Sequence, residues 1–88
     1  MVKIEEEVTV LNSHGLHARP AAIFVQIANK FDSRIMLEKE AELVDGKSII
    51  AILSLGINTG MKIKLIAEGD DAQEAFGELK KFLESNDD

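Results

Sequence analysis

Two stretches of the chain alternate hydrophobic and polar residues, as half-buried strands do. Near the N-terminus, valine or isoleucine occupies positions 2, 4, 8 and 10, and Glu6 interrupts the alternation once. Between residues 61 and 67, the apolar positions 63, 65 and 67 alternate with Lys62, Lys64 and Ile66. This period of two predicts a β-strand with one buried face in each stretch.

Two other stretches repeat hydrophobic residues every three or four positions, as amphipathic helices do. From Ala18 the apolar positions are 21, 24, 25, 28 and 31, and in the last third they are 72, 75, 76, 79, 82 and 83. Pro20 fits the first turn of the first helix, where a backbone N–H would have no helical partner. Ser48 stands as an N-cap before a run of isoleucine and leucine, which predicts a third, short helix. Residues 69–71 (GDD) are expected to cap the last helix.

Residues 33–39 and 41–44 favour a short hairpin, with apolar positions 35, 37, 43 and 44 and a turn at Asp45-Gly46. The predicted order is therefore β-α-β-β-α-β-α. Four strands with segregated helices indicate an α+β domain in which one face of an antiparallel sheet is covered. At 88 residues, the chain (1–88) is long enough for a single domain with one core. Residues 85–88 are expected to fray.

Composition narrows the classes of function. Hydrophobic residues make up 45% and charged residues 30%, as in ordinary soluble proteins. The chain has no cysteine, and its two histidines and scattered carboxylates show no metal-ligand spacing, so no metal site is expected. A net charge of −6 argues against binding to nucleic acid. Neither a signal peptide nor a stretch of ~20 apolar residues is recognisable, so no membrane insertion and a cytoplasmic location are expected.

Residues 15–22 (GLHARPAA) carry the clearest chemical signal, because they place His17 at the predicted start of a helix. Unpaired amides and the positive end of the helix dipole meet there, which suits an anion or a phosphoryl group carried on the ring. Arg19 adds a planar cation that matches phosphate oxygens. These features predict a phosphohistidine site with His17 as acceptor, although a histidine at a helix start often has no function.

A second run, residues 46–50 (GKSII) followed by 53–56 (LSLG), stands at a fixed distance from the first. Together the two runs make nearly the whole chain resemble the HPr family, the small histidine phosphocarriers of the bacterial phosphoenolpyruvate-dependent phosphotransferase system. The resemblance implies an open-faced β-sandwich, with a four-stranded antiparallel sheet and three helices on one face. It implies that His17 and Arg19 accept a phosphoryl group from enzyme I and pass it to IIA domains. Such a protein is a carrier, not an enzyme, and needs no cofactor.

Ser48 has two interpretations of about equal weight. It is a helix cap without further function, or, as the resemblance implies, a regulatory site for a serine kinase and phosphatase whose product can act as a co-repressor of a transcription regulator. We also expect a docking face on which both carrier partners bind in turn. Its predicted members are Ala18, Arg19, Ala22, Ile49, Ile50 and Leu53. A monomer suits a shuttle that must dissociate quickly.

Two positions depart from the family pattern. His14 stands where serine or asparagine is more usual, and it is either a loop residue that helps to cap the helix or one that alters the protonation and reactivity of His17. Ile50 stands where methionine or phenylalanine is frequent, which leaves the set of docking partners open. Two alternative functions also stay open: a regulatory binding module that acts through Ser48, and a carrier of the nitrogen-regulatory branch.

Overall fold

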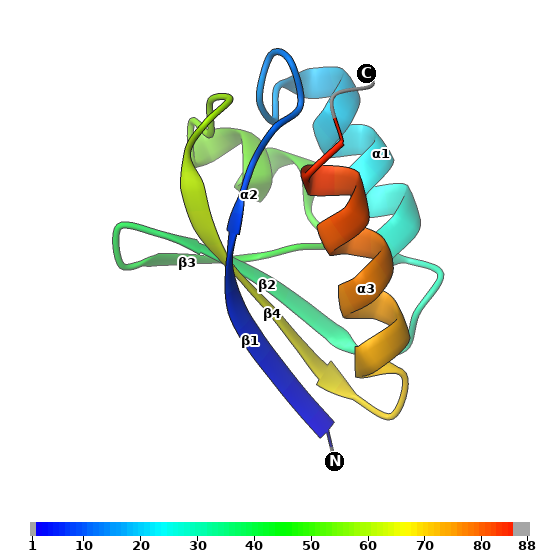
Figure 1. Ribbon diagram of the computed structural model, residues 1–88. Helices are drawn as coiled ribbons and strands as arrows, with labels where there is room; N and C mark the ends of the chain where they lie inside the picture. The colour runs from blue at the N-terminus through cyan, green and yellow to red at the C-terminus, as the bar shows by residue number, and fades with distance from the viewer. Residues whose placement is uncertain (1, 86–88) are drawn as a thin grey trace.

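In the computed structural model, which describes residues 2–85, three helices lie on one face of a four-stranded antiparallel sheet (Figure 1). The predicted order of elements and the predicted open-faced sandwich are confirmed. The predicted fraying falls mostly on residues 86–88, outside the described part of the chain. The elements are β1 Val2–Thr9, α1 Ala18–Ala28, β2 Arg34–Lys39, β3 Glu42–Asp45, α2 Ile49–Ser54, β4 Lys62–Gly69 and α3 Ala72–Leu83.

The strands lie in the order β1-β4-β2-β3, so the last strand of the chain is inserted between the first two. In this register Val8 of β1 pairs with Ile63, and Leu37 of β2 pairs with Leu65. The paired side chains point to the same side of the sheet, where α1 and α3 cover them. Phe24 of α1 is fully buried in this core. The apolar faces of the strands and of the helices therefore pack against each other in one core between the sheet and the helices.

Two apolar residues of the predicted strand faces are not buried. Val2 is 42% exposed because its partner at the end of the sheet is Gly69, which offers no side chain to cover it. Leu43 is 53% exposed because it pairs with Glu38 and therefore lies on the face of the sheet that no helix covers. A period of two identifies a strand, but only the position within the sheet decides whether its apolar face is covered.

The expected cap of the last helix is also different in detail. Gly69 ends β4, and Asp71 occupies the N-cap position of α3 without a capping hydrogen bond from its side chain. Its carboxylate instead accepts hydrogen bonds from the Ser33 hydroxyl and from the amides of Asp32 and Ser33, the last two at 2.9 Å. The Ser33 hydroxyl, followed by the Asp32 amide, holds the pKa of Asp71 below its ordinary value. Asp71 therefore ties the start of α3 to the segment that leads into β2.

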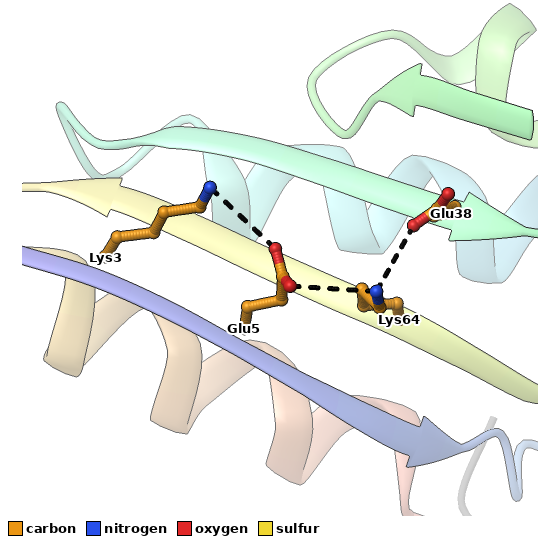
Figure 2. A network of polar contacts seen from close by, with 4 residues as sticks. All are labelled: Lys3, Glu5, Glu38 and Lys64. Carbon is orange, nitrogen blue, oxygen red and sulfur yellow. Dashed lines mark ion pairs between the residues drawn. The ribbon is translucent and has the colours of Figure 1, made fainter. Parts of the chain in front are cut away.

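The helix-free face of the sheet carries a network of ion pairs (Figure 2). Glu5 of β1 contacts Lys3 at 3.8 Å and Lys64 of β4 at 3.6 Å, and Lys64 also contacts Glu38 of β2 at 3.6 Å. These side chains are about 30% to 55% exposed, so solvent screens their attraction and each pair contributes little stability. The network makes the part of this face around Glu5 and Lys64 charged, whereas Leu43 is an exposed apolar residue on the same face.

Candidate functional site

His17 is the N-cap residue of α1. Its backbone is extended, with φ −81° and ψ −168°, and its carbonyl accepts the first helical hydrogen bond, from the amide of Ala21 at 2.9 Å. Its imidazole makes no capping hydrogen bond and is exposed to solvent. The first turn of α1 contains no acidic residue. The positive end of this helix therefore has no carboxylate of its own, and the exposed ring stands beside it.

The loop before His17 is fixed by a close backbone contact with the segment that follows α2. The amide of Leu16 donates to the carbonyl of Ile57 at 2.9 Å, and Leu16 itself is buried. Gly15 has φ +72°, and a Cβ atom there would lie only 2.4 Å from the carbonyl oxygen of Ile57. Only glycine fits both the dihedral angle and the space. Gly15 therefore allows the loop to place His17 at the start of α1.

Asn12 anchors the other side of this loop. Its buried side-chain amide donates to the carbonyls of Phe82 and Ser85, each at 3.2 Å. The amide of Leu11 donates to the carbonyl of Leu83 at 2.8 Å. The loop is therefore anchored to the end of α3, about seventy residues away along the chain. Asparagine in a turn is so common that the sequence contains no signal for this contact.

Arg19 lies in the first turn of α1 and is exposed. A cation at this end of a helix is mildly unfavourable, because it faces the positive end of the dipole. That cost is offset when an anion binds between the guanidinium and the first-turn amides. The arrangement of His17 and Arg19 is therefore suited to a dianionic group.

Helix α2 runs antiparallel to α1, with which it packs. At its start, the Nζ of Lys47 donates to the carbonyl of Phe31, just past the end of α1, at 2.8 Å. At its end, the bond between Leu16 and Ile57 reaches the start of α1. Ser48 therefore lies at the end of α2 that is remote from His17. The six residues of α2 make a helix of ~9 Å.

Ser48 is the N-cap of α2, as predicted. Its Oγ accepts a hydrogen bond from the amide of Ala51 at 3.2 Å, and its carbonyl accepts from the amide of Ile52. Ser48 is half-buried. A serine in this position has a structural role in the unmodified protein, whatever further role it has.

Helix α2, which begins after Ser48, exposes several large apolar side chains to solvent. Ile52 is its one buried residue, whereas Ile49, Ile50 and Leu53 are 40%, 81% and 39% exposed. On α1, Ala18 is exposed and Ala22 is half-buried. Three large apolar side chains on six residues are more than scattered surface hydrophobics explain, and such patches mark interaction sites. We call Ile49, Ile50 and Leu53 the apolar patch.

Lys39, at the end of β2, fixes the far end of the helix that bears the apolar patch. Its Nζ donates to the carbonyl of Leu55 at 2.7 Å and to that of Gly56 at 3.2 Å. These are carbonyls that the end of a helix leaves without helical partners, and a lysine there also complements the negative end of the dipole. Lys39 belongs to a strand, as predicted, but its contact with Leu55 could not be read from the sequence because sixteen residues separate the partners.

A surface hollow of about 620 Å³ lies at the opposite end of the sheet, lined by residues 68–71 together with Asp32, Arg34 and Glu74. It does not border His17, Arg19, Ser48 or the apolar patch. Among residues 2–85, no three histidine or carboxylate side chains are grouped so as to hold a metal ion. In the same part of the chain, none of the helices has the length and hydrophobicity needed to cross a bilayer.

Comparison with known proteins defines the class to which this fold and site belong. The family model described as "PTS HPr component phosphorylation site" matches residues 4–85, which is nearly the whole chain. The chain therefore belongs to the HPr family, as its resemblance to that family predicted. Proteins of this family are phosphocarriers of the phosphotransferase system and not enzymes.

Individual relatives are similar over almost their full length. The HPr-like protein Crh of Halalkalibacterium halodurans is 49% identical over 81 residues, which cover 92% of this chain and 96% of the relative. The crystal structure of phosphocarrier protein HPr from Bacillus anthracis superposes with a TM-score of 0.90 at 43% identity, covering 94% and 99% of the two chains. The fold is the same, and the relatives include both HPr and Crh proteins.

One solved relative bears on the expected monomer. The HPr of Thermoanaerobacter tengcongensis, 51% identical and covering 90% of this chain and 93% of its own, has been crystallised as a dimer, with a TM-score of 0.73 to this structure. Proteins of this family are therefore not always monomeric.

Proposed function

We propose that this protein is a phosphoryl carrier whose His17 accepts a phosphoryl group from phosphorylated enzyme I and passes it to a IIA domain in the cytoplasm. A ring nitrogen of His17 attacks the phosphorus of the donor's phosphohistidine. The new N–P bond forms as the donor's N–P bond breaks, and the electron pair of that bond returns to the donor's ring. The second transfer is the same step with the roles exchanged, so no water is consumed and no cofactor is required.

The observation that supports this proposal best is the exposed His17 imidazole at the N-cap of α1, unused for capping. At neutral pH a neutral imidazole nitrogen is a competent nucleophile. Transfer between two histidines is governed by positioning and by stabilisation of the charge on the transferred group. Here the first-turn amides of α1 and the guanidinium of Arg19 supply that stabilisation, and the exposed ring allows in-line approach of the donor.

The experiment that tests the proposal is the intact mass of the protein after incubation with phosphoenolpyruvate, Mg²⁺ and a bacterial enzyme I. We expect one acid-labile phosphoryl group on the wild type and none on His17→Ala. Ser48→Ala is the matched control and should be labelled like the wild type. A wild type that stays unmodified with an enzyme I that labels another HPr, or a label that survives in His17→Ala, contradicts the proposal.

A second candidate function is regulation through Ser48, alone or alongside transfer. It is favoured by the position of the Ser48 hydroxyl at the start of the helix that carries the apolar patch. A phosphoserine at a helix N-terminus is electrostatically tolerable, but it puts about two negative charges beside Ile49 and Ile50. The modification would come from a serine kinase and be removed by a phosphatase, and it would exchange carrier partners for a transcription regulator. An ATP-dependent kinase assay tests it, since phosphoserine is acid-stable and must be absent from Ser48→Ala.

A further inference from the structure

His14 lies three residues before His17, in the loop that leads to α1, and the two rings are in contact. Their centroids are 5.5 Å apart and their planes are inclined by 74°, so the edge of one ring meets the face of the other. This is a preferred geometry for aromatic pairs. The family's phosphorylation motif accounts for His17 but not for a second imidazole packed against it.

The contact matters because nothing in the helix cap fixes the His17 ring. Its side chain makes no capping hydrogen bond and is exposed. An exposed side chain of this kind can visit several staggered rotamers, whereas transfer requires one in which the reacting nitrogen faces the donor. We propose that His14 is a positioning residue, whose ring holds the imidazole of His17 in its reactive orientation. This inference rests on the proposed carrier function.

His14 can serve in this way because its own backbone is fixed. The amide of the next residue, Gly15, donates to the carbonyl of Asn12 at 3.0 Å and closes a tight turn around residues 13 and 14. Leu16 is then held by Ile57. The hydroxyl of Ser13 lies 3.5 Å from Nδ1 of His14, within hydrogen-bond range. The restraint therefore passes from the rigid loop through the ring of His14 to the ring of His17.

The size of the effect follows from the number of rotamers. If His17 without its neighbour is spread over about three staggered wells, the reactive one is populated roughly a third of the time or less. We expect the rate of phosphoryl acceptance to fall about threefold to tenfold. The stability of the fold should hardly change, because both rings are at the surface.

The experiment compares His14→Phe, which keeps a ring of similar shape, with His14→Asn, which keeps a polar side chain but removes the ring. For each variant the χ1 three-bond couplings of His17 are measured by NMR on unphosphorylated protein. The initial rate of phosphorylation by enzyme I is measured separately, and thermal unfolding serves as the control for folding. We expect wild type and His14→Phe to show the couplings of one rotamer and similar rates. His14→Asn should show averaged couplings and the slower rate at an unchanged unfolding temperature.

Unaveraged couplings and a wild-type rate in His14→Asn would overturn the proposal. So would a His14→Phe protein as slow as His14→Asn, because the ring contact would then not be the cause. The couplings need no phosphoryl group, so they remain informative even if His17 of the wild type is never phosphorylated. That result would contradict the carrier function instead.

Discussion

At the scale of single residues, the backbone near Gly15 leaves no room for a side chain. We expect Gly15→Ala to lower the free energy of unfolding by about 2–4 kcal/mol, the combined cost of a left-handed alanine and of a Cβ pressed onto the Ile57 carbonyl. Gly60→Ala is the matched control: Gly60 has φ +88°, but its Cβ would meet no atom within 4 Å. It should cost about 1–2 kcal/mol in urea denaturation. Equal losses in the two variants would contradict the role assigned to the Ile57 contact.

Ser48 allows its structural and regulatory roles to be separated. Ser48→Ala removes the acceptor for the Ala51 amide and should lower the free energy of unfolding by about 1 kcal/mol. Ser48→Asp keeps a capping oxygen and adds a charge that the helix dipole favours, so it should stay within about 0.5 kcal/mol of the wild type. Chemical denaturation measures both. Ser54→Ala, which removes an exposed hydroxyl from the end of the same helix, is the control and should have little effect. A Ser48→Asp protein as unstable as Ser48→Ala would argue against the cap.

At the scale of elements, the turn between β2 and β3 stores backbone strain. Glu40 and Ala41 both have positive φ, at 51° and 69°, in a two-residue turn where glycine or asparagine is preferred. We expect Ala41→Gly to raise the free energy of unfolding by about 0.5–1 kcal/mol. Glu42→Gly, one position later within β3, should instead destabilise by a similar amount. Thermal unfolding of the two variants checks the contrast, and destabilisation by both would refute it.

Helix α2 exposes the apolar patch, which is the predicted docking face for the carrier partners. If the apolar patch docks both partners, Leu53→Glu should slow phosphoryl acceptance from enzyme I by about tenfold or more, because a charge would have to be buried in the complex. The fold should persist, since Leu53 is 39% exposed. Gln73→Glu adds the same charge on the exposed side of α3 and serves as the control. Unchanged initial rates in Leu53→Glu would remove the apolar patch from the docking face.

At the scale of the whole molecule, Asp71 links helix and sheet through hydrogen bonds that require its charged form. Because its pKa is lower in the folded protein than in the unfolded chain, the carboxylate stabilises the fold at neutral pH. This stabilisation is fully present above the unfolded pKa of about 4 and is lost as the pH falls through the lowered folded value. We expect the urea midpoint of the wild type to fall in acid.

The variant Asp71→Asn isolates this contribution. It should be less stable than the wild type at pH 7 and should lose less stability on acidification, so that the two curves approach each other as the pH falls below about 4. Asp70→Asn, which changes the neighbouring exposed carboxylate, should follow the wild-type curve. Parallel curves for wild type and Asp71→Asn would contradict the linkage.

The sequence predicted most of the fold because its local signals agree with one another. The alternation around Ile63 and Leu65 and the helical spacing around Phe24 each mark a face that the core buries. The N-cap at Ser48 was predictable because capping depends on a few neighbouring residues. The contacts of Asn12, Lys39 and Asp71 were not predictable, because each joins two segments that are far apart in the sequence.

By itself the sequence determined the order of the elements, the position of His17 and Arg19 at a helix start and the membership of the HPr family, because these depend on residue type and short spacing. Only the tertiary structure decided that β4 lies between β1 and β2, that α2 runs antiparallel to α1, and that Ser48 lies at the end of α2 remote from His17. It also brought the rings of His14 and His17 together. The physical reason is that long-range pairing and side-chain packing are settled by the whole core, which no local stretch of sequence contains.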